Sequence, residues 1–191
     1  MEDAEQLIKN LGLQSGVLLE DIPKIDLYID QIIQLFETSF ADAKRNEDEK
    51  ILTKTMINNY AKGKLFYPVQ NKKYTRNHIM LISLIYQMKS ALSINDVKQV
   101  LDGLNKKALQ QDLNLESFYE SYLKLQQGNI TIFTEGLKEQ SKRVGQQVPN
   151  ADDAQELEQV LLIASLVHTS NLYRRAAEKL VDDMKERGKA E

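Results

Sequence analysis

Apolar residues recur at intervals of three and four along most of this sequence, and that spacing favours a mainly α fold. Turn-forming residues are scarce, with three prolines and eight glycines among 191 residues, which leaves little room for a turn-rich β fold. Helices are therefore expected at about Asp3–Leu11, Ile25–Phe40, Lys54–Lys62, Ile79–Met88, Ser93–Leu104, Leu115–Leu125, Ile130–Val144 and Ala151–Arg187.

Positive charge is concentrated in one part of the chain. Residues 50–107 contain eleven Lys and Arg against two acids, a balance of +9, whereas the whole chain carries −3. The other residues must therefore carry a net charge of −12. Such a charge asymmetry is typical of a protein in which one segment binds a polyanion and the other segments do not. A solvated lysine-rich face is the alternative interpretation.

The stretch Thr53–His78 contains six Lys and Arg, four asparagines and no acid. If residues 54–62 form a helix with Thr53 as its N-cap, hydrogen-bonding side chains lie together on one face of that helix. These side chains are Lys54, Thr55, Asn58, Asn59 and Lys62. An asparagine amide can pair with both N6 and N7 of adenine, while lysine meets phosphates or guanine. The helix is therefore predicted to contact DNA, although a polar face that meets water is the alternative.

A small β-hairpin is expected directly after this helix. Residues 65–75 have β-prone side chains on either side of Pro68, then a turn that holds Lys72 and Lys73, then a helix cap at Thr75. A helix followed by a basic hairpin is the layout of a winged helix-turn-helix. In that layout the helix enters the major groove and the wing touches the flanking backbone or the minor groove.

The segment from about Leu52 to Leu104 resembles the DNA-binding domain of the MerR-like (mercury-resistance-regulator) transcription factors. The recognition-helix and wing motifs of that family fall on Ile57, Asn58, Asn59, Tyr60, Leu65, Phe66, Pro68, Lys72, Tyr74 and Ile79, and its closing motif falls on "ALSINDVKQVL". The wording "MINNY" and the preceding "IDLYIDQIIQL" are more similar still to a bacterial family called domain of unknown function 1836, usually regarded as winged-helix regulators.

Two departures from the MerR-like pattern matter. Asn58 stands where the family has a backbone-bracing Arg, and Gly63 comes one place early, with Lys64 in the usual glycine slot. The base contacts of the family therefore need not transfer to this chain. With the resemblance, the candidate DNA-binding residues are Thr53, Lys54, Thr55, Asn58, Asn59, Tyr60, Lys62, Lys64, Lys72, Lys73, Tyr74 and Arg76.

Three regions are expected: N-terminal helices in residues 1–45, a MerR-like winged-helix domain in residues 46–107, and a C-terminal helical domain in residues 108–191. The last region would serve dimerisation or bind an effector or a partner. Its long final helix carries a stripe expected to join two protomers, formed by Leu162, Leu166, Tyr173 and Leu180. A central helix buried in its own bundle is the alternative.

Enzyme chemistry is not expected. The chain has no cysteine and two histidines, His78 and His168, and it contains none of the common nucleotide-binding or zinc-protease motifs. We therefore predict neither a cofactor nor a metal site. The longest apolar block is too short to span a membrane and the N-terminus does not look like a signal peptide, so a cytoplasmic protein without membrane contact is expected.

These features predict a homodimeric, sequence-specific regulator of transcription that binds double-stranded DNA, with a recognition helix at about 53–62 and a wing at about 66–74. The alternative is a non-enzymatic protein-interaction module that keeps the winged-helix fold and presents its basic face to an acidic partner. The sequence does not indicate whether a small-molecule effector binds.

Overall fold

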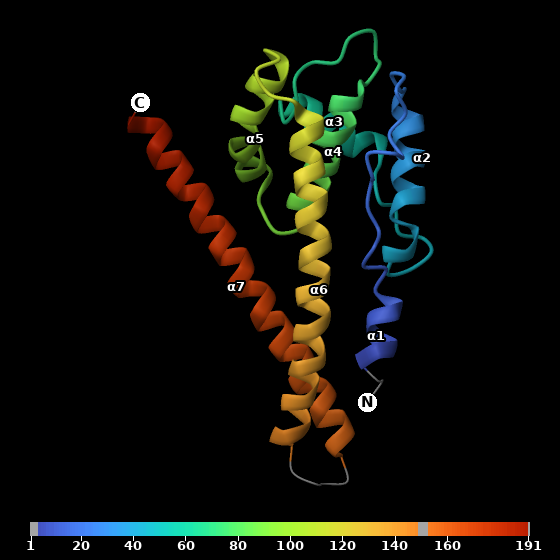
Figure 1. The fold of residues 1–191 in the computed structure, drawn as a ribbon, viewed down its shortest axis with the longest axis vertical. Coiled ribbons are helices and arrows are strands. Elements are labelled where there is room, and N and C mark those ends of the chain that lie inside the picture. Colours follow the sequence, from blue (N-terminus) through green and yellow to red (C-terminus); the bar gives the residue numbers. More distant parts are fainter. Residues whose placement is uncertain (1–3, 149–152, 191) are drawn as a thin grey trace.

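Helices supply the secondary structure of the described residues, 4–148 and 153–190, of the computed structural model (Figure 1). In chain order they are α1 (Ala4–Asn10), α2 (Ile29–Ser39), the 3-10 helix η1 (Ala41–Ala43), α3 (Lys54–Lys62), α4 (Arg76–Met88), α5 (Ile94–Leu109), α6 (Leu115–Gln147) and α7 (Ala154–Ala190). The mainly α architecture expected from the apolar spacing is thus observed.

Helix α4 forms the centre of a head made of α2, α3, α4, α5 and the first turns of α6 (Figure 1). Every residue from His78 to Ile85 is buried, which explains why this segment is apolar on nearly all sides. The hydroxyl of the buried Ser83 has a hydrogen-bond partner in Tyr119 of α6. The Tyr119 hydroxyl lies 2.8 Å from the Ser83 Oγ and 2.8 Å from the Val17 carbonyl oxygen. The start of α6 is thereby fixed against the head.

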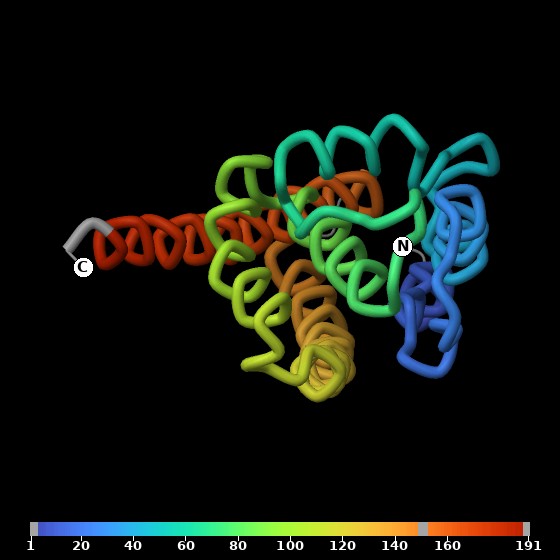
Figure 2. The backbone as a smooth tube through the Cα atoms, turned by 90° about the horizontal axis from the view of Figure 1, so that it is seen from above, coloured from blue at the N-terminus to red at the C-terminus, as the bar shows by residue number. Residues whose placement is uncertain are grey.

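Helices α6 and α7 form a long stem below the head, with α7 returning antiparallel to α6 (Figure 1). They pack near the distal end of the stem through Leu137, Val144 and Leu162. Helix α7 then diverges from α6 and extends past the head on one side (Figure 2). Near its end it contacts α5, where the Lys185 ammonium lies 2.7 Å from the Asp96 carboxylate.

The predicted β-hairpin wing at about 66–74 is wrong, and with it the winged helix-turn-helix fold, because the described residues contain no strand or sheet. Residues 70–73 do turn, but a single isolated bridge, Gln70 to Lys73, is all that pairs the two arms. Tyr74 instead exchanges two backbone hydrogen bonds with Leu27, at 2.8 and 2.9 Å. Pro68 has no N–H to donate to a ladder, so the arm before the turn cannot extend the pairing.

Several predicted helix boundaries also differ from the structure. Helix α4 begins at Arg76 rather than Ile79, and α5 ends at Leu109 rather than Leu104. Helix α2 begins at Ile29 rather than Ile25, because the backbone of Leu27 is engaged with Tyr74. The two helices expected at Leu115–Leu125 and Ile130–Val144 are one continuous helix, α6. The predicted first residues of the final helix, from Ala151, lie partly outside the described residues, as does Asp3 of the first predicted helix.

The predicted N-cap of α3 is confirmed, and α5 is capped in the same way. The Thr53 Oγ1 accepts a hydrogen bond from the backbone N–H of Met56 at 3.2 Å, which fixes the start of α3. The Ser93 Oγ accepts one from the N–H of Asp96, also at 3.2 Å, at the start of α5. Both helices thus begin where the sequence signals place them.

Candidate nucleic-acid interface

Helix α3 has one buried face and one exposed polar face. Ile57 and Tyr60 are inserted into the head, with 0% and 4% of their surface exposed. On the opposite face, five polar side chains are exposed: Lys54, Thr55, Asn58, Asn59 and Lys62. The side chains of Asn58 and Asn59 make no hydrogen bond with other described residues. Their amides are therefore available to a ligand.

A tight reversal at the end of α3 places Lys64 beside this face. The N–H of Lys64 binds the Ala61 carbonyl at 3.0 Å, and the N–H of Leu65 binds the Tyr60 carbonyl at 3.0 Å. These two bonds form a Schellman motif, in which the residue at the position of Lys64 is left-handed. Lys64 has a φ of 56°, so it occupies a conformation that normally favours glycine. The reversal thus presents a cation at a position that is usually glycine in this motif.

The turn at residues 70–73 presents two further cations. Asn71 and Lys72 have φ values of 50° and 59°, and the N–H of Lys73 binds the Gln70 carbonyl at 2.9 Å, as in a type I′ turn. Lys72 and Lys73 are exposed. The Lys73 amine lies 5.5 Å from the centroid of the Tyr28 ring, just before α2. The turn is therefore held next to the start of α2 without a β-sheet.

Few acids neutralise these lysines within the described residues. Lys54 lies 4.0 Å from Asp30, and both side chains are largely exposed, so solvent screens this pair. Lys62, Lys64 and Lys72 make no ion pair with the described residues. We call the following residues the basic surface: Lys54, Thr55, Asn58, Asn59, Lys62, Lys64, Lys72 and Lys73.

Three of the other predicted DNA-binding residues serve the fold around α3. Tyr60 and Tyr74 are buried, and burial raises the pKa of Tyr60 to about 12. The Thr53 hydroxyl caps α3. These side chains therefore do not belong to the basic surface.

Arg76 is the fourth predicted residue that the fold uses. Its guanidinium donates to the backbone carbonyls of Leu19 and Ile22. The same group pairs with the Glu116 carboxylate at 2.7 Å. Arg76 therefore joins the loop before α2 to the start of α6, and it is not free to meet a phosphate.

His78 has a structural role next to the turn. Its Nδ1 accepts from the Thr75 N–H at 3.1 Å, and its Nε2 donates to the Tyr67 carbonyl at 3.1 Å. The ring is 2% exposed, and this burial lowers the pKa of His78. The fold therefore holds the neutral imidazole, with the proton on Nε2.

The contribution of α5 was not anticipated from the sequence. A hollow of about 580 Å³ separates the end of α3 from α5, and Lys62, Lys64 and Lys106 line it. Asn105 donates from Nδ2 to the Leu65 carbonyl at 2.8 Å, while its buried Oδ1 makes no hydrogen bond with the described residues. Since Asn105 follows Leu65 by 40 residues, no local sequence signal could have joined α5 to the end of α3.

The residues predicted to join two protomers have different surroundings along α7. Leu162 is 8% exposed and packs on Leu137 and Val144 of α6, with Leu166 partly buried beside it. Tyr173 and Leu180 are 71% and 64% exposed. The first pair therefore holds the stem together, while the second pair is accessible.

None of the described helices contains an apolar stretch that could span a bilayer. Within the same parts of the chain, no group of three or more His, Cys, Asp or Glu could hold a metal ion.

The fold and the basic surface define a helical head with a cationic face, attached to a two-helix stem. The family model described as Domain of unknown function (DUF1836) matches residues 17–122, which is more than half of the 191 residues. The chain therefore belongs to this family. The match contains the whole basic surface, whereas α7 lies beyond it.

Comparisons with curated proteins and with solved structures gave no match. The family match confirms the resemblance to domain of unknown function 1836, and none of the comparisons supports the resemblance to MerR-like regulators.

Proposed function

We propose that the protein is a non-enzymatic, sequence-specific regulator of transcription that contacts double-stranded DNA through the basic surface. The observation that carries this proposal is the exposed face of α3, where Asn58 and Asn59 stand between Lys54 and Lys62 and make no hydrogen bond with the described residues. Adjacent asparagines weaken an exposed helix, so a binding role accounts for them better than helix stability does.

The expected roles differ along the basic surface. Asn58, Asn59 and Thr55 are expected to meet base edges, since an amide can pair with both N6 and N7 of adenine. Lys72 and Lys73, on the turn at residues 70–73, are expected to meet phosphates, which set affinity and orientation but carry no sequence information. Affinity and sequence preference should therefore respond to different substitutions.

We propose a homodimer as well, because α6 exposes apolar side chains that a monomer would leave in water. Phe118, Leu125 and Ile132 follow one another at intervals of seven and are 41%, 68% and 65% exposed. A seven-residue repeat of apolar side chains is typical of a helix that pairs with another helix. Tyr173 and Leu180 of α7 add further apolar surface for a second protomer to cover. A symmetric pair of heads would then address two half-sites on DNA.

The test is selection of bound sequences from a random double-stranded DNA pool by the purified full-length protein, followed by sequencing. An enriched motif, particularly a palindrome, supports a sequence-specific dimer. Asn59→Ala should flatten the sequence preference, whereas Lys73→Ala should weaken binding to all sequences alike. Identical effects of the two substitutions would contradict the division of roles.

The second candidate is a protein-interaction module whose basic surface meets an acidic protein. The observation that favours it is the lack of ion pairs at Lys62, Lys64 and Lys72 within the described residues, because these cations would suit acidic side chains as well as phosphates. This candidate predicts no binding to DNA at physiological salt and a stoichiometric protein that co-purifies with the chain. Loss of that protein in Lys72→Gln/Lys73→Gln would favour it over DNA binding.

A further inference from the structure

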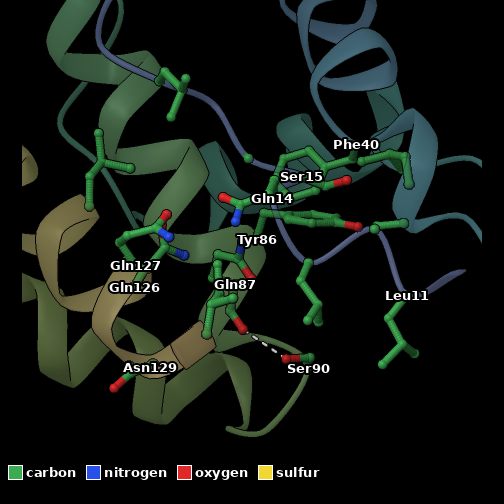
Figure 3. A pocket seen from close by; sticks show the side chains of 18 of the residues that line it. Leu11, Gln14, Ser15, Phe40, Tyr86, Gln87, Ser90, Gln126, Gln127 and Asn129 are labelled. Atoms are coloured by element: carbon green, nitrogen blue, oxygen red, sulfur yellow. Dashed lines mark hydrogen bonds between the residues drawn. The ribbon is translucent and has the colours of Figure 1, made fainter. Parts of the chain in front are cut away.

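A pocket of about 720 Å³ lies between the head and the stem, away from the basic surface. Four parts of the chain surround it: the loop after α1, the segment from Phe40 to Ile51 after α2, the end of α4 and the middle of α6. Its size falls within the range of small-molecule sites in proteins. Figure 3 shows these parts around one space, with labels on Gln14, Ser15, Tyr86, Gln87, Gln126 and Gln127.

The loop that borders the pocket is fixed by its backbone. Gly12 has a φ of 57°, and a Cβ at this position would overlap the backbone carbonyl of Asp42 in η1. Four residues on, the Gly16 N–H donates to the Ser39 carbonyl at 2.9 Å. These contacts hold the loop against the end of α2 and against η1, so the pocket has a defined wall.

Apolar and aromatic side chains form much of the lining. The Tyr86 ring packs on Phe40, with ring centroids 4.8 Å apart. Leu123, Ile130 and Phe133 approach from α6. Such a wall can cover the apolar body of a ligand, as in most small-molecule sites.

Polar groups are placed between these apolar side chains. Gln14, Gln87 and Gln127 line the pocket, and their side chains make no hydrogen bond with the described residues. We call these three side chains the free amides. A few polar groups in an apolar wall are what fixes the orientation of a ligand in most small-molecule sites.

The pocket also holds a cation without a carboxylate partner among the described residues. The Lys89 amine lies 4.9 Å from the centroid of the Tyr86 ring, and burial lowers the pKa of this amine. Glu49 is the one acid among the described lining residues, and it accepts the Arg45 N–H at 2.8 Å. Lys50 adds a second cation to the lining. An ammonium held partly out of water favours an anionic partner.

From this geometry we propose that the pocket binds a small organic anion with an apolar body, whose carboxylate or phosphate pairs with Lys89 while its body packs on Tyr86 and Phe40. The free amides supply hydrogen bonds to the polar end. The site is separate from the basic surface, so the inference does not depend on DNA binding.

The test is a titration of the isotope-labelled full-length protein with 4-phenylbutyrate, followed by backbone-amide NMR, and by calorimetry for affinity. Phenyl phosphate is a second probe that distinguishes a phosphate from a carboxylate preference, and 4-phenylbutan-1-ol lacks the charge. Shifts confined to residues 11–18, 40–51, 86–90 and 123–133 are expected, with weaker binding of the alcohol. Shifts elsewhere, or no saturable binding of either anion, would overturn the proposal.

Substitution of Lys89 provides the second readout. Lys89→Gln should weaken binding of the anions about tenfold and leave binding of the alcohol unchanged, since charge-assisted hydrogen bonds are stronger than neutral ones. Lys124→Gln removes the same charge from an exposed position on α6 and should change neither. Equal effects of the two substitutions would contradict the role of Lys89.

Discussion

Tyr60 shows how a polar residue of a predicted DNA-contact helix can belong to the core. Its side chain is 4% exposed, and its hydroxyl makes no hydrogen bond with the described residues. A buried hydroxyl without a partner destabilises the folded state. We therefore expect Tyr60→Phe to raise the free energy of unfolding by about 1 kcal/mol in urea titrations. A lower free energy of unfolding in Tyr60→Phe would show that the Tyr60 hydroxyl has a hydrogen-bond partner in the folded protein.

Lys64 occupies a left-handed conformation that costs a side chain about 1 kcal/mol. Lys64→Gly should therefore raise the free energy of unfolding by about that amount. Lys62→Gly is the matched control, because it places glycine in the last helical turn, where it should lower stability by about 1 kcal/mol. Thermal unfolding of the two variants should move in opposite directions, and parallel shifts would exclude this explanation.

At the residue scale, the sequence allows prediction where the cause is local. Thr53 and Ser93 cap helices because a side-chain oxygen reaches an N–H three residues on, a relation visible in the sequence. Arg76 could not be placed in the same way. Its carbonyl partners, Leu19 and Ile22, lie more than 50 residues upstream, so a free phosphate-binding role and a structural role look alike in the sequence.

At the scale of elements, the predicted hairpin does not extend because its next hydrogen-bonded pair cannot form. After Gln70 and Lys73 that pair would be Pro68 and Thr75, but Pro68 has no N–H and the Thr75 N–H donates to His78 Nδ1. The unbroken α6 has a different origin. Its polar stretch around Gly128 looks like a break, but packing on both sides, on the head and on α7, carries the helix through.

The exposed apolar repeat of α6 belongs to the same scale, and it predicts the oligomeric state. Leu125→Lys together with Ile132→Lys should convert a dimer to a monomer in analytical ultracentrifugation, because charges would enter the apolar seam. Urea unfolding of the variant should still be cooperative, since both side chains are exposed. A native protein that sediments as a monomer would contradict the dimer.

At the scale of the whole molecule, stability should depend on pH through His78. Burial lowers its pKa in the folded state, so the unfolded chain binds the proton more tightly, near pH 6.5. The free energy of unfolding should therefore fall as the pH drops below about 6.5. Urea titrations between about pH 7.5 and 5.5 measure this slope.

The two histidines provide a matched pair for this prediction. His78→Gln should remove most of the slope, whereas His168→Gln, at an exposed position on α7, should keep it. A slope that survives in His78→Gln would assign the pH dependence to other groups.

The basic surface is expected to bind DNA, and the salt dependence of affinity tests this central claim most directly. Fluorescence anisotropy would compare the native protein with Lys54→Gln/Lys62→Gln/Lys72→Gln/Lys73→Gln and with a control that loses four exposed lysines elsewhere, at Lys9, Lys98, Lys124 and Lys142. The log–log slope should fall by about 3.6 in the first variant and stay unchanged in the control, since each of the four phosphate contacts contributes about 0.9. Equal slopes in all three proteins, or no binding by the native protein at low salt, would contradict DNA binding by this surface.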